Sequence, residues 1–322
     1  MSSVSLCLPT YNGAAYLAEA IRSVLAQTFT DFEFIIVDDQ STDESATIAR
    51  SFNDRRVTFH QNPTRLGLVE NWNRCLDLAR GEYVCIFHQD DVMLPHNLAA
   101  KVEALAQNPA AGLVYSNVYL IDADGRNLAE SWFFPTTPSH DFVESGSIFF
   151  ERLLLGDNLV ACPSVMVRRV GYEKRGRFDP RFRFTADLNM WLRLLLAYDI
   201  VYLAQPLVKY RWHHSNESHN FSETGQWAEI YEAKMAVFND CPGQIPRRNV
   251  LLKTFQTQYK RDSVIRALHH IRHRDYQHGS WYFKFAVADQ KFSGECLGLF
   301  LKSLLAAGGL ILRSRMRSVL PR

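Results

Sequence analysis

The sequence predicts an α/β protein with a mostly parallel central sheet flanked by helices and with a helical C-terminal extension. Two patterns predict this class. Between residues 4 and 117, short apolar runs alternate with segments of helical spacing, and the connections are short, which is typical of a parallel sheet with helices on both faces. Beyond about residue 220, runs of strand character stop and only helical spacing continues.

The first elements follow one another regularly. An apolar run at residues 4–8 is stopped by Pro9, and apolar residues at helical spacing follow over 16–25. Residues 83–87 are apolar throughout, as expected for a strand buried on both faces. The expected strands of this part are residues 4–8, 32–37, 57–60 and 83–87, and the expected helices are residues 16–25, 41–52 and 68–79.

The middle of the chain is less regular. Residues 122–125 have turn composition and are expected to close a hairpin. Residues 132–147 combine prolines with Ser and Thr and have no clear period, which predicts a long functional loop or lid. The other expected elements are strands at 112–117, 118–121, 164–167, 200–203 and 207–212, and helices at 95–106, 148–155 and 187–196.

The C-terminal part is expected to be helical over residues 226–238, 249–271 and 277–288, with interruptions at Pro242, Pro246 and Gly279. A last apolar segment, residues 296–312, is short and interrupted for a membrane-spanning helix, which needs roughly 20 apolar residues. Three arginines follow it closely. An interfacial amphipathic helix on an anionic leaflet fits this pattern best, and a helix packed on the core is the alternative.

Composition bounds the class of protein. The chain has 322 residues, of which 47% are hydrophobic and 22% charged, as is ordinary for a globular protein. This length allows one large domain with an appendage or two modest domains. The formal net charge is +2, but residues 247–322 are rich in Lys, Arg and His. The basic last part favours an anionic partner, and no nucleic-acid partner is expected.

Cysteine usage and the first residues indicate the compartment. The six cysteines have no Cys-x-x-Cys spacing, which argues for a reducing compartment and against a zinc site or a disulfide framework. Met1-Ser2-Ser3 leads directly into an apolar strand without a basic segment, so no secretory peptide is expected. The expected location is cytoplasmic, with peripheral contact at the inner face of the plasma membrane as the further expectation.

Two of the expected parallel strands end in paired carboxylates, Asp38-Asp39 and Asp90-Asp91. Ligands of open α/β sheets bind at the carboxyl ends of the strands, so both pairs are expected to open onto one edge. A divalent cation bound to a diphosphate keeps several waters and takes one or two protein carboxylates. The pairs therefore indicate a metal and phosphate site. The alternative is that each pair caps the following helix.

Later segments carry residues of matching chemistry. Asp187 opens an expected helix, where a single acid is most often a cap. Arg211 and His213 follow the last expected strand, and such side chains bind phosphate oxygens or a metal. Arg65, in the loop before the helix at 68–79, is a further candidate for contacting a phosphate.

Seven segments occur in the order and spacing of one known family. They are residues 4–13 (VSLCLPTYNG), 23–28 (SVLAQT), 37–43 (VDDQSTD), 79–83 (ARGEY), 89–91 (QDD), 187–193 (DLNMWLR) and 210–213 (YRWH). Together they resemble the family 2 glycosyltransferases, which have the GT-A fold, a Rossmann-like α/β fold. The resemblance covers about residues 4–215 and is specific because several motifs agree together.

The resemblance implies transfer of a sugar, with inversion, from a nucleotide-diphosphate-sugar donor to a saccharide or lipid-linked saccharide acceptor. The implied setting is polysaccharide synthesis of the O-antigen or capsule type. It also implies a Mg²⁺ or Mn²⁺ cofactor. Under this reading Pro9, Tyr11 and Asp39 hold the base and ribose. Asp90 contacts the ribose or the metal, and Asp91 ligates the metal.

The resemblance further implies that Asp187 is the general base for the acceptor hydroxyl. Arg211 and His213 would steady the departing diphosphate. Two positions depart from the family pattern, because His88 stands where many relatives have an acid and Ala186 replaces the acid before the catalytic Asp. The first departure concerns metal preference, and the second concerns the basicity of Asp187.

Two other functions share some of these sequence features. A metal-dependent phosphohydrolase or nucleotidyltransferase also uses strand-end aspartates, but residues 9–12 offer neither a nucleophilic carboxylate nor a glycine-rich phosphate cradle. A non-catalytic sugar-nucleotide-binding or scaffold protein is disfavoured because Asp90, Asp91 and Asp187 are present together. The expected domains are a catalytic domain at 1–220, with a nucleotide-binding half at 1–117 and an acceptor half at 118–220, and a helical extension at 221–322.

Overall fold

The protein is described by a computed structural model that covers residues 2–128 and 138–287. Its chain divides into two compact units. The first unit comprises residues 1–221 and 232–246, and the second comprises residues 222–231 and 247–322. The first unit holds the sheet, and the second is helical in the part that is described.

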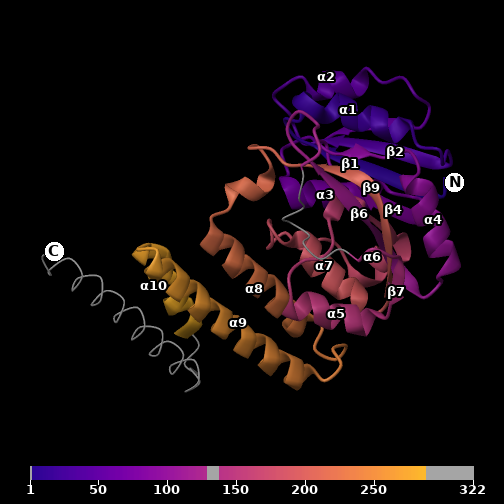
Figure 1. Ribbon diagram of the computed structural model, residues 1–322. Helices are drawn as coiled ribbons and strands as arrows, with labels where there is room; N and C mark the ends of the chain where they lie inside the picture. Colours follow the sequence, from indigo (N-terminus) through magenta and orange to yellow (C-terminus); the bar gives the residue numbers. More distant parts are fainter. Residues whose placement is uncertain (1, 129–137, 288–322) are drawn as a thin grey trace, which may run out of the picture. The chain divides into compact units, whose positions relative to one another are not determined.

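One nine-stranded sheet organises the first unit over its described residues (Figure 1). The strand order is β3-β2-β1-β4-β8-β6-β9-β5, and β7 pairs with β9. The strands are β1 (Val4–Thr10), β2 (Phe32–Asp38), β3 (Val57–Gln61), β4 (Tyr83–Ile86), β5 (Val92–Met93), β6 (Ala111–Ile121), β7 (Phe142–Glu144), β8 (Val165–Arg168) and β9 (Asp199–Arg211).

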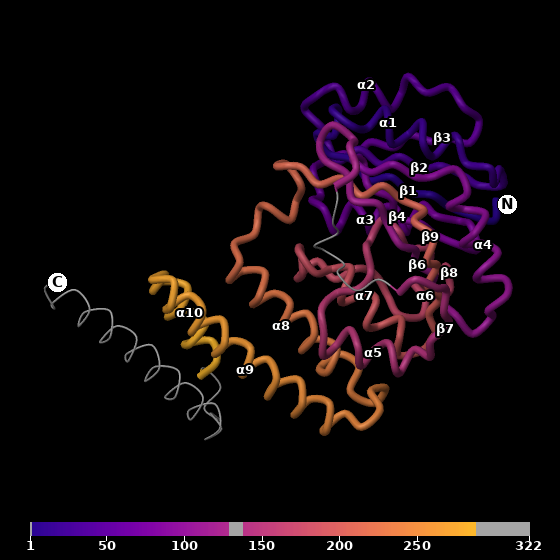
Figure 2. The backbone as a smooth tube through the Cα atoms, in the orientation of Figure 1, coloured from indigo at the N-terminus to yellow at the C-terminus, as the bar shows by residue number. Residues whose placement is uncertain are grey.

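The N-terminal half of this sheet is parallel. β1 lies between β2 and β4 and pairs in parallel with both, and β3 continues the parallel set beyond β2 (Figure 2). Every residue of β1 and of β4 is buried, as expected for strands covered on both faces. Because Thr10 lies opposite Asp38, the carboxyl ends of β1 and β2 meet at one edge. The predicted α/β class with a mostly parallel sheet is confirmed.

The second half of the sheet is mixed. β8 runs antiparallel between β4 and β6, whereas β9 runs parallel to β6. The sequence predicted two strands where β9 is one, and it also divided β6 in two. The register explains the difference: Ser116 faces Leu203 and Asn117 faces Pro206, so β9 carries a bulge at the proline and then continues.

Seven α-helices of the first unit lie wholly within its described residues. The predicted apolar face of the helix at 187–196 is confirmed, since Leu188, Trp191, Leu192 and Leu195 are all buried in α7. The seven helices are α1 (Ala14–Leu25), α2 (Ser45–Arg50), α3 (Leu68–Leu78), α4 (Asn97–Gln107), α5 (Gly146–Leu155), α6 (Arg169–Arg175) and α7 (Ala186–Leu195). Two short 3-10 helices, η1 (Cys162–Ser164) and η2 (Glu217–Asn220), complete the set.

The connections predicted in the middle of the chain are resolved in part. The Asp122 backbone N–H donates to the Arg126 carbonyl, and Ile121 forms a bridge with Asn127, so the predicted turn at 122–125 does close a short hairpin. Of the predicted loop at 132–147, residues 142–144 form β7 and α5 begins at Gly146, while residues 132–137 lie outside the described part.

In its described residues, the second unit contains the first part of α8 (Glu223–Asp240) with α9 (Arg248–Arg272) and α10 (Tyr276–Val287). The expected break at Gly279 is wrong, because this glycine lies inside α10. A Cβ atom there would lie 2.7 Å from the Ile271 side chain, so the glycine allows α10 to approach α9 closely. No helix in the described residues is long and apolar enough to cross a membrane. The segment at 296–312 lies outside these residues.

Candidate active site

Asp39 fixes the loop that follows β3. It comes directly after β2 and is only 2% exposed. Its carboxylate accepts hydrogen bonds from the backbone N–H groups of Leu66 and Gly67, both at 2.7 Å, and from the Asn62 side chain at 2.8 Å. Gly67 has a φ of 88°, a conformation that favours glycine. The carboxylate therefore holds this loop against the end of the parallel sheet.

The same loop brings Arg65 to Tyr11. The Arg65 guanidinium carbon lies 4.0 Å from the centre of the Tyr11 ring, a cation–π contact. Tyr11 follows β1 and exchanges backbone hydrogen bonds with the Gln89 side chain, at 2.9 and 3.2 Å. Pro9 lies buried within β1, opposite Val37. The loops after three parallel strands thus meet at this edge.

Asp90 and Asp91 follow β4 and form, with His88, a cluster whose ligand atoms lie within 4.8 Å of one another. Asp91 is 1% exposed, and its Oδ1 accepts the Arg211 backbone N–H at 2.8 Å. Within the described residues, Asp91 Oδ2 accepts no hydrogen bond. The atom lies 3.6 Å from His88 Nδ1. A buried carboxylate oxygen without a donor is costly unless a cation approaches it.

This cluster fits a divalent cation. Burial raises the pKa of Asp91 well above its ordinary value, and the charge of Asp90 raises it further. Burial lowers the pKa of His88, which favours the neutral imidazole that can act as a ligand. His88 stacks on Trp72 with ring centres 5.6 Å apart, so its orientation is fixed. Its imidazole therefore offers a ligand atom beside the two carboxylates.

His213 is directed at the paired aspartates by its own neighbours. The Ser215 backbone N–H donates to His213 Nδ1 at 3.2 Å, so the ring proton lies on Nε2. This nitrogen is 3.0 Å from Asp90 Oδ2. Asn216 accepts the backbone N–H of His213 and donates to Asp90 at 3.3 Å. The loop after β9 is therefore tied to the loop after β4.

The guanidinium of Arg211 has a different setting from the one that the resemblance implies. The residue is 2% exposed. Its side chain donates to the carbonyls of Asp90, Asp122 and Ala123 and, at 2.6 Å, to Glu19. These contacts connect the two strand ends to α1 and to the hairpin turn. They favour a positioning role, and the diphosphate contact of Arg211 stays a prediction.

Asp187 occupies the first turn of α7. Its Oδ1 accepts the Leu188 backbone N–H at 2.7 Å and its Oδ2 accepts the Asn158 side chain at 3.1 Å. Burial raises the pKa of Tyr210, and the charges of the paired aspartates and of Asp187 raise it further. Burial also raises the pKa of the Cys162 thiol, and the charge of Asp187 raises it further. All three carboxylates therefore act on Tyr210, and Asp187 and Asp91 both act on Cys162.

Three residues of this region received no role from the sequence. Gln89 joins the loops after β1 and β4, Asn158 holds Asp187, and Asn216 holds both His213 and Asp90. Gln89 and Asn216 stand next to residues that were singled out, so proximity in the sequence was the available signal. Asn158 lies far along the chain from Asp187, and no local pattern marks it.

Solved structures place this fold among the GT-A glycosyltransferases. A crystal structure of Staphylococcus aureus TarS 1–349 with UDP-GlcNAc covers 88% of this chain and 91% of its own, with a TM-score of 0.57 and 16% identity. The mannosyltransferase PcManGT of Pyrobaculum calidifontis, with GDP-Man and Mn²⁺, covers 98% of this chain and 82% of its own, with a TM-score of 0.58 and 17% identity. At these identities the likeness concerns the fold.

The sequence assigns the family. The family model for glycosyl transferase family 2 matches residues 5–174, and the chain belongs to that family. An uncharacterized glycosyltransferase of Methanocaldococcus jannaschii is 32% identical over 213 residues, 65% of this chain and 70% of the relative. The putative colanic acid biosynthesis glycosyl transferase WcaA of Escherichia coli is 26% identical over 197 residues, 61% of this chain and 67% of the relative. For a Rickettsia typhi glycosyltransferase the match spans 64% of the relative.

Proposed function

We propose that the chain transfers a sugar from a nucleotide-diphosphate-sugar to a hydroxyl group of a saccharide or lipid-linked saccharide, with inversion, in surface-polysaccharide synthesis. The observation that carries this proposal is the convergence of Asp91 and Asp187 on one region, with an Asp91 oxygen buried and lacking a donor among the described residues. The Asp91 carboxylate is suited to ligating a cation, and the Asp187 carboxylate is suited to accepting a proton. Membership of the family supports the reaction class.

The donor nucleotide is assigned to the edge formed by β1, β2 and the loop after β3. Tyr11 offers a ring surface, already backed by Arg65, on which a base can stack. Asp39 Oδ2 has one hydrogen bond from the described residues, so a lone pair remains for a base N–H or a ribose hydroxyl. Pro9 shapes this edge from within β1.

The diphosphate is assigned to the cluster around Asp90 and Asp91. The carboxylates of Asp90 and Asp91, with the His88 imidazole, would hold Mg²⁺ or Mn²⁺. Such an ion neutralises negative charge on the leaving diphosphate. His213 would donate from Nε2 to a phosphate oxygen once the donor displaces Asp90 from it. Arg211 would act through the backbone, by fixing the positions of both aspartates.

The proton is assigned to Asp187. As the acceptor oxygen bonds to the anomeric carbon, the bond from that carbon to the diphosphate oxygen breaks and the hydroxyl proton passes to the Asp187 carboxylate. Attack from the face opposite the diphosphate inverts the anomeric centre. Asn158 and the backbone of Leu188 hold the carboxylate in place, which keeps it ready for proton transfer.

A thermal-shift screen of nucleotide-sugars, with and without Mn²⁺, tests the donor class. A ligand that binds only the native state at about 100 times its Kd adds about 2.7 kcal/mol, enough to raise the Tm by several degrees. We expect such a shift for one donor class, and a larger one with Mn²⁺. The absence of any shift across uridine, guanosine, thymidine and cytidine diphosphate sugars would contradict the proposal. Binding without consumption of the donor, when acceptors are supplied, would favour the non-catalytic alternative.

The domain division and membrane contact are also proposals. Residues 1–220 would carry catalysis, and residues 221–322 would form an extension that contacts an anionic membrane. The basic composition of residues 247–322 supports the second point. Flotation with anionic liposomes should recover the full chain and leave a chain truncated after residue 295 behind. Equal recovery of both forms would remove the membrane contact from segment 296–322.

A further inference from the structure

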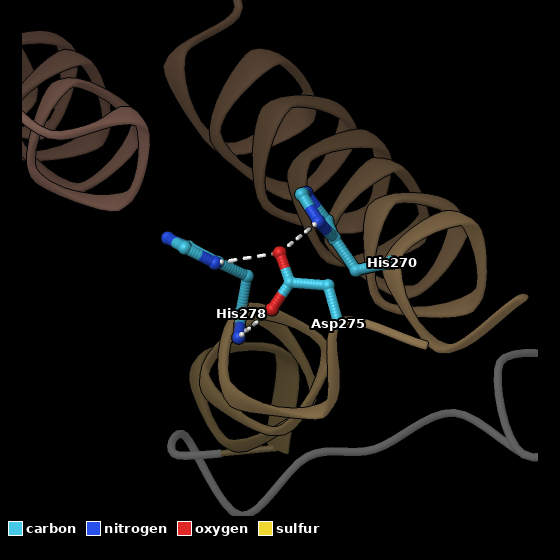
Figure 3. Close-up of side chains that lie close together, drawn as sticks. All are labelled: His270, Asp275 and His278. Carbon is cyan, nitrogen blue, oxygen red and sulfur yellow. Dashed lines mark hydrogen bonds and ion pairs between the residues drawn. The ribbon is translucent and has the colours of Figure 1, made fainter. Parts of the chain in front are cut away.

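A cluster of two imidazoles and a carboxylate lies in the second unit. His270 is in the last turn of α9, Asp275 precedes α10, and His278 is in the first turn of α10. Figure 3 shows the three side chains directed at one another across the turn between the helices. Asp275 Oδ2 lies 3.1 Å from His270 Nδ1 and 2.7 Å from His278 Nδ1. One carboxylate oxygen therefore contacts two imidazole nitrogens.

The partners of the two His270 ring nitrogens indicate that a cation belongs in this cluster. The Nε2 nitrogen of His270 lies 3.2 Å from the Glu223 carboxylate, which can only accept a hydrogen bond when ionised. The Asp275 carboxylate also only accepts, so a neutral His270 can donate to just one of the two carboxylates. When it donates to Glu223, its Nδ1 lone pair points at the anionic oxygen of Asp275. Two lone pairs at 3.1 Å repel each other unless a cation lies between them. That cation is either a second proton on the imidazole or a metal ion.

The surroundings resemble those of a metal ligand. A histidine that binds a metal through one nitrogen commonly donates the other N–H to a carboxylate, as His270 does to Glu223. Glu223 is itself held by the Tyr282 hydroxyl at 2.8 Å and by Arg266. Tyr282 also stacks on the His270 ring with an interplanar angle of 17°. These contacts fix the orientation of the imidazole before any ion binds.

The Asp275 carboxylate is fixed as well. Its Oδ1 accepts the His278 backbone N–H at 3.3 Å, the bond expected of a residue that caps a helix N-terminus. This bond leaves Oδ2 directed at the imidazoles. Bond lengths of about 2.0–2.2 Å to nitrogen and oxygen ligands place neighbouring ligand atoms roughly 3.3 Å apart in tetrahedral geometry. The observed separations are a few tenths of an ångström shorter, so small side-chain rotations would admit an ion.

We infer that His270, Asp275 and His278 bind a divalent first-row transition ion such as Zn²⁺, which clamps the α9–α10 turn. Two imidazoles with one carboxylate suit Zn²⁺, Co²⁺ or Ni²⁺ better than Mg²⁺. The side chains of Asp275 and His278 are each 38% exposed, which leaves room for water as a further ligand. The missing Cys-x-x-Cys spacing does not argue against this site, because none of its ligands is a cysteine.

The site is separate from the proposed catalytic chemistry, because all of its residues belong to the second unit. Its ligands come from the two ends of one short connection, so the ion would join the end of α9 to the start of α10. Arg274, between them, has a φ of 64°, the left-handed conformation that side chains other than glycine rarely adopt. A clamp across the connection would oppose fraying at this point.

Equilibrium dialysis of the full chain against Zn²⁺, at pH 7.5 and with excess Mg²⁺ to occupy the site proposed at His88, Asp90 and Asp91, tests the inference. We expect His270→Ala/His278→Ala to bind one Zn²⁺ fewer per chain than the wild type. Asp275→Asn keeps a good capping residue and should bind Zn²⁺ at least about tenfold more weakly. Glu223→Gln changes the partner of His270 Nε2, together with the contacts from Tyr282 and Arg266, and should weaken binding by about 10–100-fold.

The matched control is His269→Ala/His273→Ala. These histidines lie in the same turn, with ring centres 4.6 Å apart, and are not part of the cluster. The control should bind as much Zn²⁺ as the wild type. Loss of the ion in the control, with retention in the cluster variants, would assign binding to the other pair and overturn the inference. Equal Zn²⁺ in every chain, or none in the wild type, would overturn it too and leave a protonated imidazole as the cation.

Discussion

Asp91→Asn is expected to lower kcat/KM for sugar transfer by at least about 10²-fold, the typical cost of removing one preorganised stabiliser of developing charge. The amide has the shape of the carboxylate and its oxygen can keep the bond from the Arg211 backbone. The substitution removes the negative charge of the Asp91 carboxylate. The Oδ2 atom of this carboxylate faces His88 and accepts no hydrogen bond from the described residues. The measurement is initial rate as a function of Mn²⁺ and donor concentration.

The same substitution should not harm the fold. An uncompensated charge buried to 1% exposure is unfavourable, so Asp91→Asn is expected to leave the Tm of the metal-free protein unchanged or raise it. Asp38→Asn is the matched control. Asp38 is another fully buried aspartate at the end of a parallel strand, and its Oδ2 binds Gln61 and the Ser41 backbone. Its Oδ1, like Asp91 Oδ2, accepts no hydrogen bond from the described residues, but among those residues Asp38 belongs to no cluster of candidate metal ligands. Its variant should keep activity within a few-fold. Unchanged turnover and Mn²⁺ dependence in Asp91→Asn would remove the residue from the metal site.

The parallel half of the fold could be predicted because its signals are local. An apolar run as dense as residues 83–87 needs cover on both faces, and a central strand between two layers of helices provides it. Parallel pairing then brings the ends of β1, β2 and β4 to one edge, so the contact between Tyr11 after β1 and Gln89 after β4 follows from the topology.

The mixed half could not be predicted in the same way. β8 lies antiparallel between β4 and β6, although it is distant from both in sequence, and no local pattern specifies that insertion. The bulge at Pro206 depends on the partner strand, because it absorbs a register mismatch with β6. Gly279 was expected to end a helix by propensity alone, whereas close packing against Ile271 overrides that propensity.

The candidate site shows the same contrast between local signals and non-local contacts. Residue types, strand ends and the family resemblance were sufficient to propose the carboxylates, but the side chains that hold them come from elsewhere in the chain. Asn158 reaches Asp187 across 29 positions, and Asn216 reaches Asp90 across 126. The setting of Arg211 is equally non-local, because Glu19 of α1 accepts its guanidinium. A sequence motif identifies a chemical group, whereas its hydrogen bonds depend on the completed tertiary structure.

Asp187→Asn is expected to slow transfer by about 10²–10⁴-fold, the usual contribution of a positioned proton acceptor. Donor binding should be retained, because Asp187 lies on α7 and makes none of the contacts assigned to the nucleotide. The amide can keep the bond from the Leu188 backbone through its oxygen. The measurement is the single-turnover rate with saturating donor and acceptor, together with the donor-induced rise in Tm. A large loss of rate with an unchanged thermal shift is the expected combination.

The control for this variant is Asp199→Asn at the opposite end of β9, where the carboxylate accepts the Gly146 backbone N–H at 2.9 Å. This variant also replaces a carboxylate with an amide, but at the end of β9 opposite to Arg211, whose backbone binds Asp91. It should leave the rate unaltered. Retention of wild-type transfer by Asp187→Asn would mean that another group removes the proton. A loss of donor binding would instead place Asp187 against the donor. The two variants separate the charge and proton roles, because Asp91→Asn should abolish the effect of Mn²⁺ on donor binding and Asp187→Asn should leave it intact.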